Sequence, residues 1–349
     1  MLSGLSEPAI AALIGLGGGL LLGLAARLGR FCTLGAIEDA LYGGSTLRLR
    51  AWGLAIALSV TGVFTLAAAG LLPLGDVFYL RPGWNPFAHL GGGLVFGYGM
   101  ALAGTCGYGA LARLGGGDLR ALVIVLVMGT AALATLIGPL APLRVALFPP
   151  DLLPTTGATG LAQGTARLTG LSPSVLGAGV GVIGTALLTA PLLRVPRVLL
   201  GAALVAGAVL TGWLGTAWLW QHGFAGIRPQ SHTFAAPPGE TLLWLMTGGL
   251  RPLGFGIGSV AGVVIGACIG SLRQNGFRWE ACEDPRELRR QIAGAALMGA
   301  GAVVAQGCTI GQGVSAASTL SYGAPLTLLG IGVGAALGLR QLIVGFALD

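Results

Sequence analysis

The sequence predicts an all-α protein that crosses a membrane about nine times. Of its 349 residues, 54% are hydrophobic and only 9% are charged, and the mean hydropathy is +0.85. A soluble domain carries roughly 25% charged residues, so this chain has too few charges to cover a globule in water. The other observation is an internal duplication. The expected unit is one transmembrane domain, 1–349, with pseudo-repeat halves at roughly 1–140 and 197–349.

The predicted spans follow from length, because a helix needs about 20 apolar residues to cross a bilayer. We expect them at roughly 9–28, 52–72, 87–105, 121–140, 172–192, 197–220, 252–272, 291–307 and 323–343. The first run is expected to be a span and not a cleaved signal, since more apolar runs follow it.

The two copies of the duplication are the stretch from His89 to Leu114 and the stretch from Gln291 to Ala316. At a common offset of 202, the glycines and the cysteine coincide: Gly92, Gly97, Gly99, Cys106 and Gly109 fall on Gly294, Gly299, Gly301, Cys308 and Gly311. Glycine matches alone are weak, because the chain has 64 glycines. A matched pair among five cysteines is a stronger sign of an internal repeat.

Three segments are predicted to be broken or re-entrant helices. The range 29–44 is too short to cross the membrane and too apolar for a simple loop, and Cys32 lies near its start. The stretches after Cys106 and Cys308 are similar in kind. Irregular backbone at membrane depth persists only where it lines a cavity or is buried in protein. Glu38 and Asp39 are expected to cap the first segment or to pair with arginine.

The arginines are expected to mark membrane sidedness and not a nucleic-acid surface, because they lie singly or in pairs between apolar runs. One side receives fourteen: Arg27, Arg30, Arg48, Arg50, Arg113, Arg120, Arg194, Arg197, Arg273, Arg278, Arg286, Arg289, Arg290 and Arg340. The other side receives five: Arg81, Arg144, Arg167, Arg228 and Arg251. The protein is then expected in the cell inner (plasma) membrane. The positive-inside rule places its amino terminus outside and its carboxyl terminus in the cytoplasm. The two repeats are consequently inverted, as in transporters whose site lies at the repeat interface.

The candidate substrate-binding residues are Cys32, Cys106 and Cys308, because each lies where a helix is expected to break. The amino terminus of a half-helix offers free N–H groups that attract anions. A neutral thiol adds a weak donor and a soft sulfur, which favours an anion that carries sulfur or selenium. Tight packing is the competing interpretation. Cys268 is expected to be a buried hydrophobe, and no role is expected for Cys282.

Other polar residues are less informative. Arg113 either adds positive charge at a cytoplasmic mouth or anchors a span end, and Gln312 either binds substrate oxygens or caps backbone. The three histidines are scattered without metal-ligand spacing, so we expect no metal. No P-loop is present, and the sequence predicts a non-enzyme without a cofactor.

Three cysteine-containing stretches follow one another in order: GRFCTLGAIEDAL, FGYGMALAGTCGYGALARLGGG and MGAGAVVAQGCTIGQGVSAAS. They resemble the signature stretches of the YeeE/YedE family of sulfur-compound transporters, with Thr105 where that family is expected to have glycine. The resemblance implies an hourglass-shaped inner-membrane protein whose constriction is lined by cysteines. It implies that Cys32, Cys106 and Cys308 pass thiosulfate along through S–H hydrogen bonds without covalent chemistry. A small cytoplasmic sulfurtransferase is the partner that it suggests.

Three alternatives remain open at this point. One is a membrane thiol redox or sulfur-relay protein, which the absence of a CxxC pair disfavours. Another is a transporter of a different sulfur or selenium species. The third is a passive pore for a small neutral solute, in which the thiols are incidental.

Overall fold

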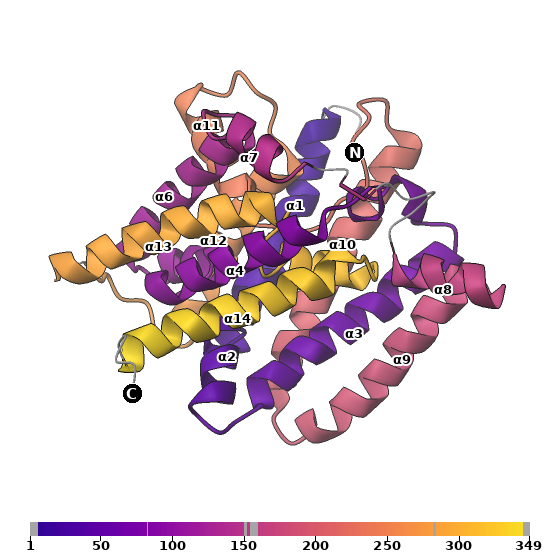
Figure 1. The fold of residues 1–349 in the computed structure, drawn as a ribbon, viewed down its shortest axis with the longest axis horizontal. Coiled ribbons are helices and arrows are strands. Elements are labelled where there is room, and N and C mark those ends of the chain that lie inside the picture. Colours follow the sequence, from indigo (N-terminus) through magenta and orange to yellow (C-terminus); the bar gives the residue numbers. More distant parts are fainter. Residues whose placement is uncertain (1–5, 82, 150–151, 154–159, 282–283, 345–349) are drawn as a thin grey trace.

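The computed structural model describes residues 6–81, 83–149, 152–153, 160–281 and 284–344, which fold into an all-helical molecule (Figure 1). Its long helices are α1 (Glu7–Leu28), α3 (Leu47–Ala68), α4 (Pro86–Ala103), α6 (Leu119–Leu136), α9 (Pro173–Leu192), α10 (Pro196–His222), α12 (Phe255–Arg273), α13 (Pro285–Val304) and α14 (Gly323–Val344). Each overlaps one predicted span. The shorter helices are α2 (Thr33–Leu41), α5 (Gly107–Gly115), α7 (Ala141–Leu147), α8 (Leu161–Thr169) and α11 (Pro237–Met246). Cys282 lies outside the described residues.

Eight of the long helices within the described ranges are long and apolar enough to cross a membrane, which makes the chain a multi-pass membrane protein. The ninth, α13, begins earlier than the predicted span, at Pro285, in the charged sequence PRELRR. Its start is fixed by Asp284, whose side chain accepts a hydrogen bond from the Arg286 N–H at 2.8 Å. The first turns of α13 are therefore polar, and only the later turns are apolar.

The two repeat helices, α4 and α13, pack directly on each other, and Figure 1 shows them alongside α14. A Cβ atom on Gly99 would lie 2.5 Å from the Gly294 carbonyl oxygen, and one on Gly92 would lie 2.9 Å from that of Gly301. Because early residues of α4 meet late residues of α13, the two helices are antiparallel. Glycine allows this close backbone approach, as it does in many membrane helix pairs.

This seam between α4 and α13 is reciprocal. At the offset of 202, Gly92 corresponds to Gly294 and Gly99 corresponds to Gly301. In the fold the pairs are crossed: Gly92 lies against Gly301, and Gly99 lies against Gly294. Such self-complementary contact is typical of two-fold symmetry. The antiparallel packing agrees with an inverted repeat, while the boundaries of the halves at 1–140 and 197–349 stay a prediction.

The remaining long helices flank this seam. The α1 and α12 helices pack closely through glycines on both, with a Cβ atom on Gly23 placed 2.5 Å from the Ala267 N–H nitrogen. The α9 helix lies at the edge beside α3 (Figure 1) and exposes apolar side chains such as Ile183 and Leu187. In a membrane such side chains face lipid, and their exposure needs no further partner.

Both repeat helices end in the same way. Gly104 follows α4 with φ of 73°, and Gln306 follows α13 with φ of 59°. The two residues coincide at the offset of 202. A left-handed residue stops a helix, and glycine adopts this conformation without strain, whereas glutamine does so at a cost. Each break is followed two residues later by a repeat cysteine.

Candidate functional site

The first two candidate cysteines lie at the amino ends of short helices. Cys32 precedes α2 in an extended conformation, with φ of −143° and ψ of 129°. Cys106 precedes α5, and its sulfur accepts a hydrogen bond from the Gly109 N–H at 3.3 Å. A cysteine sulfur replaces the usual oxygen cap at this helix start. At Cys106 one N–H group of the first turn thus points toward the sulfur, whereas the Cys32 side chain accepts no such hydrogen bond.

Cys308 is held by donors from two parts of the chain. Its sulfur accepts hydrogen bonds from the Gly311 N–H at 3.4 Å and from the Phe234 N–H at 3.2 Å. The segment that follows is a π-helical turn, Gly311–Ala316, and not the α-helical half-helix that follows Cys106. Wide π-type turns are often found at functional sites. Because both donors act on sulfur, the S–H proton is left to donate elsewhere.

The three candidate cysteines converge. Cys106 lies within electrostatic range of both Cys32 and Cys308, which places the three thiols in one region. Cys106 and Cys308 are fully buried, whereas Cys32 is half-buried. Cys268 is a half-buried free thiol on α12.

A segment without regular secondary structure, residues 230–234, supports Cys308, and no sequence pattern predicts it. His232 is fully buried, and its Nδ1 atom lies 2.6 Å from the Ser259 hydroxyl. Its carbonyl accepts a hydrogen bond from the Ser315 hydroxyl at 2.7 Å. The next residue, Thr233, places its hydroxyl 3.9 Å from the sulfur of Cys308. The segment thus brings a hydroxyl and a backbone donor to the thiol.

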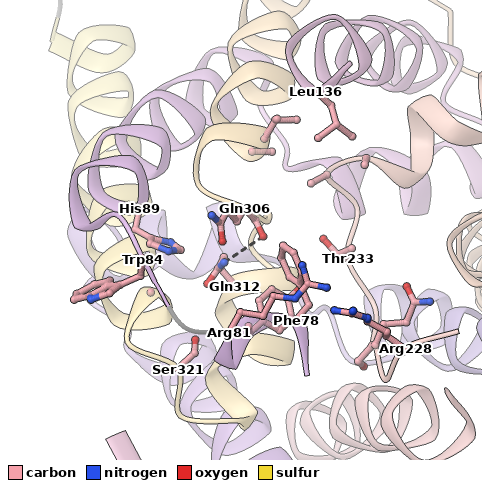
Figure 2. A pocket seen from close by; sticks show the side chains of 18 of the residues that line it. Phe78, Arg81, Trp84, His89, Leu136, Arg228, Thr233, Gln306, Gln312 and Ser321 are labelled. Atoms are coloured by element: carbon pink, nitrogen blue, oxygen red, sulfur yellow. Dashed lines mark hydrogen bonds between the residues drawn. The ribbon is translucent and has the colours of Figure 1, made fainter. Parts of the chain in front are cut away.

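A cavity of about 710 Å³ opens beside this segment (Figure 2). Thr233, Gln306 and Gln312 line it, and Figure 2 shows a hydrogen bond between the two glutamines. Arg81 and Arg228 are exposed and also line the cavity, so it opens to the surface. Cys308 contacts Thr233, and the cavity therefore ends one side chain away from the buried thiol.

Three arginines give the cavity positive charge: Arg81, Arg144 and Arg228. Arg81 lies over the Phe78 ring with 5.0 Å between its guanidinium carbon and the ring centre. Arg144 donates to the Thr135 carbonyl at 3.1 Å. All three belong to the side of the membrane that the sequence predicts to be outside. Sequence spacing identified them only as sidedness markers, because the α10–α11 and α6–α8 connections that carry two of them meet only in the folded chain.

Two other predicted residues have defined contacts. Gln312 donates from Nε2 to the Gln306 carbonyl at 3.2 Å, so it caps backbone and also lines the cavity. Arg113 donates to the Gly104 carbonyl at 3.0 Å and so fixes the break before Cys106. Arg113 therefore positions the chain before Cys106. The sequence suggests only a charge at the cytoplasmic mouth or an anchor at a span end.

Asp39 on α2 and two of the histidines have separate partners. Asp39 forms an ion pair with Arg48 at 3.3 Å, as expected for that carboxylate. His89 lines the cavity, and its Nδ1 atom lies 3.0 Å from the Thr327 hydroxyl. His222 lies near the exposed end of α10, where its Nδ1 atom is 3.0 Å from the Trp218 carbonyl oxygen.

Comparison with known proteins adds independent evidence. The sequence profile of a family described as sulphur transport matches residues 28–337, which includes all three candidate cysteines. The chain is also 28% identical over 329 residues to a protein named thiosulfate transporter TsuA from Escherichia coli (strain K12). That match covers 87% of this chain and 87% of the relative.

Proposed function

Because this chain belongs to the sulphur transport (YeeE/YedE) family, we propose that it takes up thiosulfate or a related sulfur-containing anion across the cell inner membrane. The observation that carries the proposal is the convergence of Cys32, Cys106 and Cys308 at broken helices next to an arginine-lined cavity. In this proposal the amino terminus lies outside, the carboxyl terminus lies in the cytoplasm, and the cavity faces outward.

The proposed path starts at the arginines. Their charge attracts the anion and compensates part of its lost hydration. Thr233 and the donors around Cys308 receive it next, followed by Cys106 and then Cys32. Each thiol donates a weak S–H hydrogen bond and is released unchanged, so binding at each station stays weak enough to permit passage. No covalent bond to sulfur forms.

On the other side of the thiols, two arginines lie near the proposed exit. Arg27 donates to the Ala112 carbonyl at 3.0 Å and lies within electrostatic range of Arg113. Both belong to the arginine-rich side that the sequence predicts to be cytoplasmic. A small sulfurtransferase that consumes the anion there is the partner that we propose for this mouth.

The test of the function is flux into proteoliposomes that contain the purified full chain. We expect radiolabelled thiosulfate to accumulate faster than in empty vesicles, and urea, a neutral solute, to enter at the background rate. Equal stimulation of both solutes would indicate a passive pore. A persulfide or disulfide on Cys106 or Cys308 during turnover, found by mass spectrometry, would instead indicate a sulfur relay.

Replacing Arg228 with glutamine is expected to raise the KM for thiosulfate by about fivefold with little change in kcat, since it removes one attractive charge at the outer mouth. The difference should shrink at high salt, because the Debye length falls from about 10 Å at 0.1 M to 3 Å at 1 M. Initial uptake rates at several salt concentrations measure this.

The matched control for that variant is Arg194→Gln, which removes the same charge from an exposed arginine that does not line the cavity. We expect its KM to equal that of the parent. A salt-independent loss in Arg228→Gln, or an equal change in Arg194→Gln, would argue against capture by the cavity charge.

A further inference from the structure

Thr309 carries a buried hydroxyl with no oxygen or nitrogen partner in the described part of the fold. The residue directly follows Cys308 and is fully buried. Its Oγ1 atom has no nitrogen or oxygen hydrogen-bond partner among the described residues, and the group that it interacts with is the Cys106 thiol. The side chain lies beside the Cys106 thiol, so the hydroxyl occupies the region between the two repeat cysteines. Thr33, which directly follows Cys32, is also buried and has an unpartnered Oγ1 atom.

Several other buried hydroxyls among the described residues are satisfied by the fold, although those of Thr185 and Ser271, which lie on other helices, are not. Thr135 donates to the Ala131 carbonyl at 2.8 Å, and Thr319 donates to the Ala316 carbonyl at the same distance. A buried polar group without a partner destabilises the folded state, and valine has nearly the same shape as threonine without this penalty. A buried hydroxyl whose neighbour is only a weakly hydrogen-bonding thiol therefore points to a stronger acceptor that it binds during function.

The repeat does not require this hydroxyl. At the offset of 202, Thr309 coincides with Gly107, which has no side chain. The hydroxyl is thus present on one side of the paired cysteines only, and it breaks the two-fold symmetry of the constriction.

We propose that the Thr309 hydroxyl is a substrate-binding group that donates a hydrogen bond to an oxygen of the passing sulfur oxyanion, with Thr33 acting likewise beside Cys32. This inference rests on the proposed function and names what recognises the oxygen-bearing end of the substrate. A hydroxyl is a stronger donor to an anionic oxygen than a thiol is. The soft S–H groups then contact the terminal sulfur. The two kinds of donor together select anions that carry both a terminal sulfur and anionic oxygens.

The test compares Thr309→Val with Thr309→Ser in the full chain, using radiolabelled thiosulfate in proteoliposomes. We expect the valine variant to lose about tenfold in kcat/KM, because one hydrogen bond to a charged oxygen is lost. The serine variant is expected to keep most of the uptake. Thermal unfolding in detergent should show the valine variant to be at least as stable as the parent, because the unsatisfied hydroxyl is gone.

Thr135→Val is the matched control, since it removes an equally buried hydroxyl that bonds only within its own helix. It is expected to transport at the parental rate. Parental uptake by Thr309→Val, or a loss of stability that accounts for its loss of uptake, would overturn the proposal for Thr309 and leave the transport function standing. A parent protein that moves no thiosulfate would overturn both.

Discussion

Cys308→Ala is expected to lower thiosulfate uptake by about a hundredfold, with Cys106→Ala close behind. The sulfur of Cys308 accepts two backbone N–H groups, at 3.2 and 3.4 Å, and its proton is free to donate. Alanine removes the donor and also leaves the Phe234 and Gly311 N–H groups without their acceptor. Uptake should therefore fall through lost substrate contact and through a local rearrangement of the site.

The serine variant separates these two effects. In Cys308→Ser an oxygen replaces the sulfur as acceptor and donor, so the local structure should persist and part of the uptake should return. A sulfur relay through a persulfide would not be rescued by serine, because oxygen cannot carry the transferred sulfur. Initial rates in proteoliposomes, normalised to the amount of monodisperse protein, measure the difference.

Cys268→Ala is the control for both cysteine variants. Cys268 is a half-buried free thiol on α12 and does not take part in the contacts around Cys106 and Cys308. We expect uptake at the parental rate. Parental uptake in Cys106→Ala and Cys308→Ala as well would remove the thiols from the mechanism.

Gly99→Leu is expected to disrupt the packing of α4 on α13 and to destabilise the fold severely. A Cβ atom at Gly99 would lie 2.5 Å from the Gly294 carbonyl oxygen, and one at Gly294 would lie 2.6 Å from the Gly99 carbonyl oxygen. These neighbours are backbone and cannot move aside, so α4 and α13 would have to separate. We expect a destabilisation of about 4 kcal/mol or more, against a total stability of about 5–15 kcal/mol for a typical protein.

Size-exclusion chromatography in detergent measures this outcome as the loss of the monodisperse peak. Gly332→Leu is the matched control, because Gly332 lies on the neighbouring helix α14 and has open space where the side chain would go. It should elute as the parent does. A monodisperse, thermally stable Gly99→Leu protein would contradict the close packing at the seam.

The sequence predicted the fold well where apolar length and periodic glycine carry the information. The nine long helices overlap the nine predicted spans, and α2 forms within the range 29–44 with Cys32 at its start. The start of α13 was less predictable, because helix capping by Asp284 extends it into polar sequence that hydropathy excludes. The π-helical turn after Cys308 was not predicted either, since its packing against Phe234 and Thr233 arises only on folding.

The candidate site could be predicted only in part. Three cysteines were identified because they are rare and lie at glycine-rich breaks. The segment 230–234 has no period and no motif, and its place is fixed by Ser259 and Ser315, which are distant in sequence. Thr309 gave no signal, because an unpartnered hydroxyl is a property of the folded interior. Local pattern therefore identified the thiols, and the tertiary contacts revealed what surrounds them.

The glycine seam between α4 and α13 also limits how the protein can move. Backbone packed on backbone has no side chains that can change rotamer, so the two helices cannot slide without losing contact along their length. We therefore expect α4 and α13 to stay packed together as one rigid unit. If thiosulfate passes between Cys308 and Cys106 as proposed, we expect the required movement to occur in the short segments next to Gly104 and Gln306 and not along the α4–α13 seam.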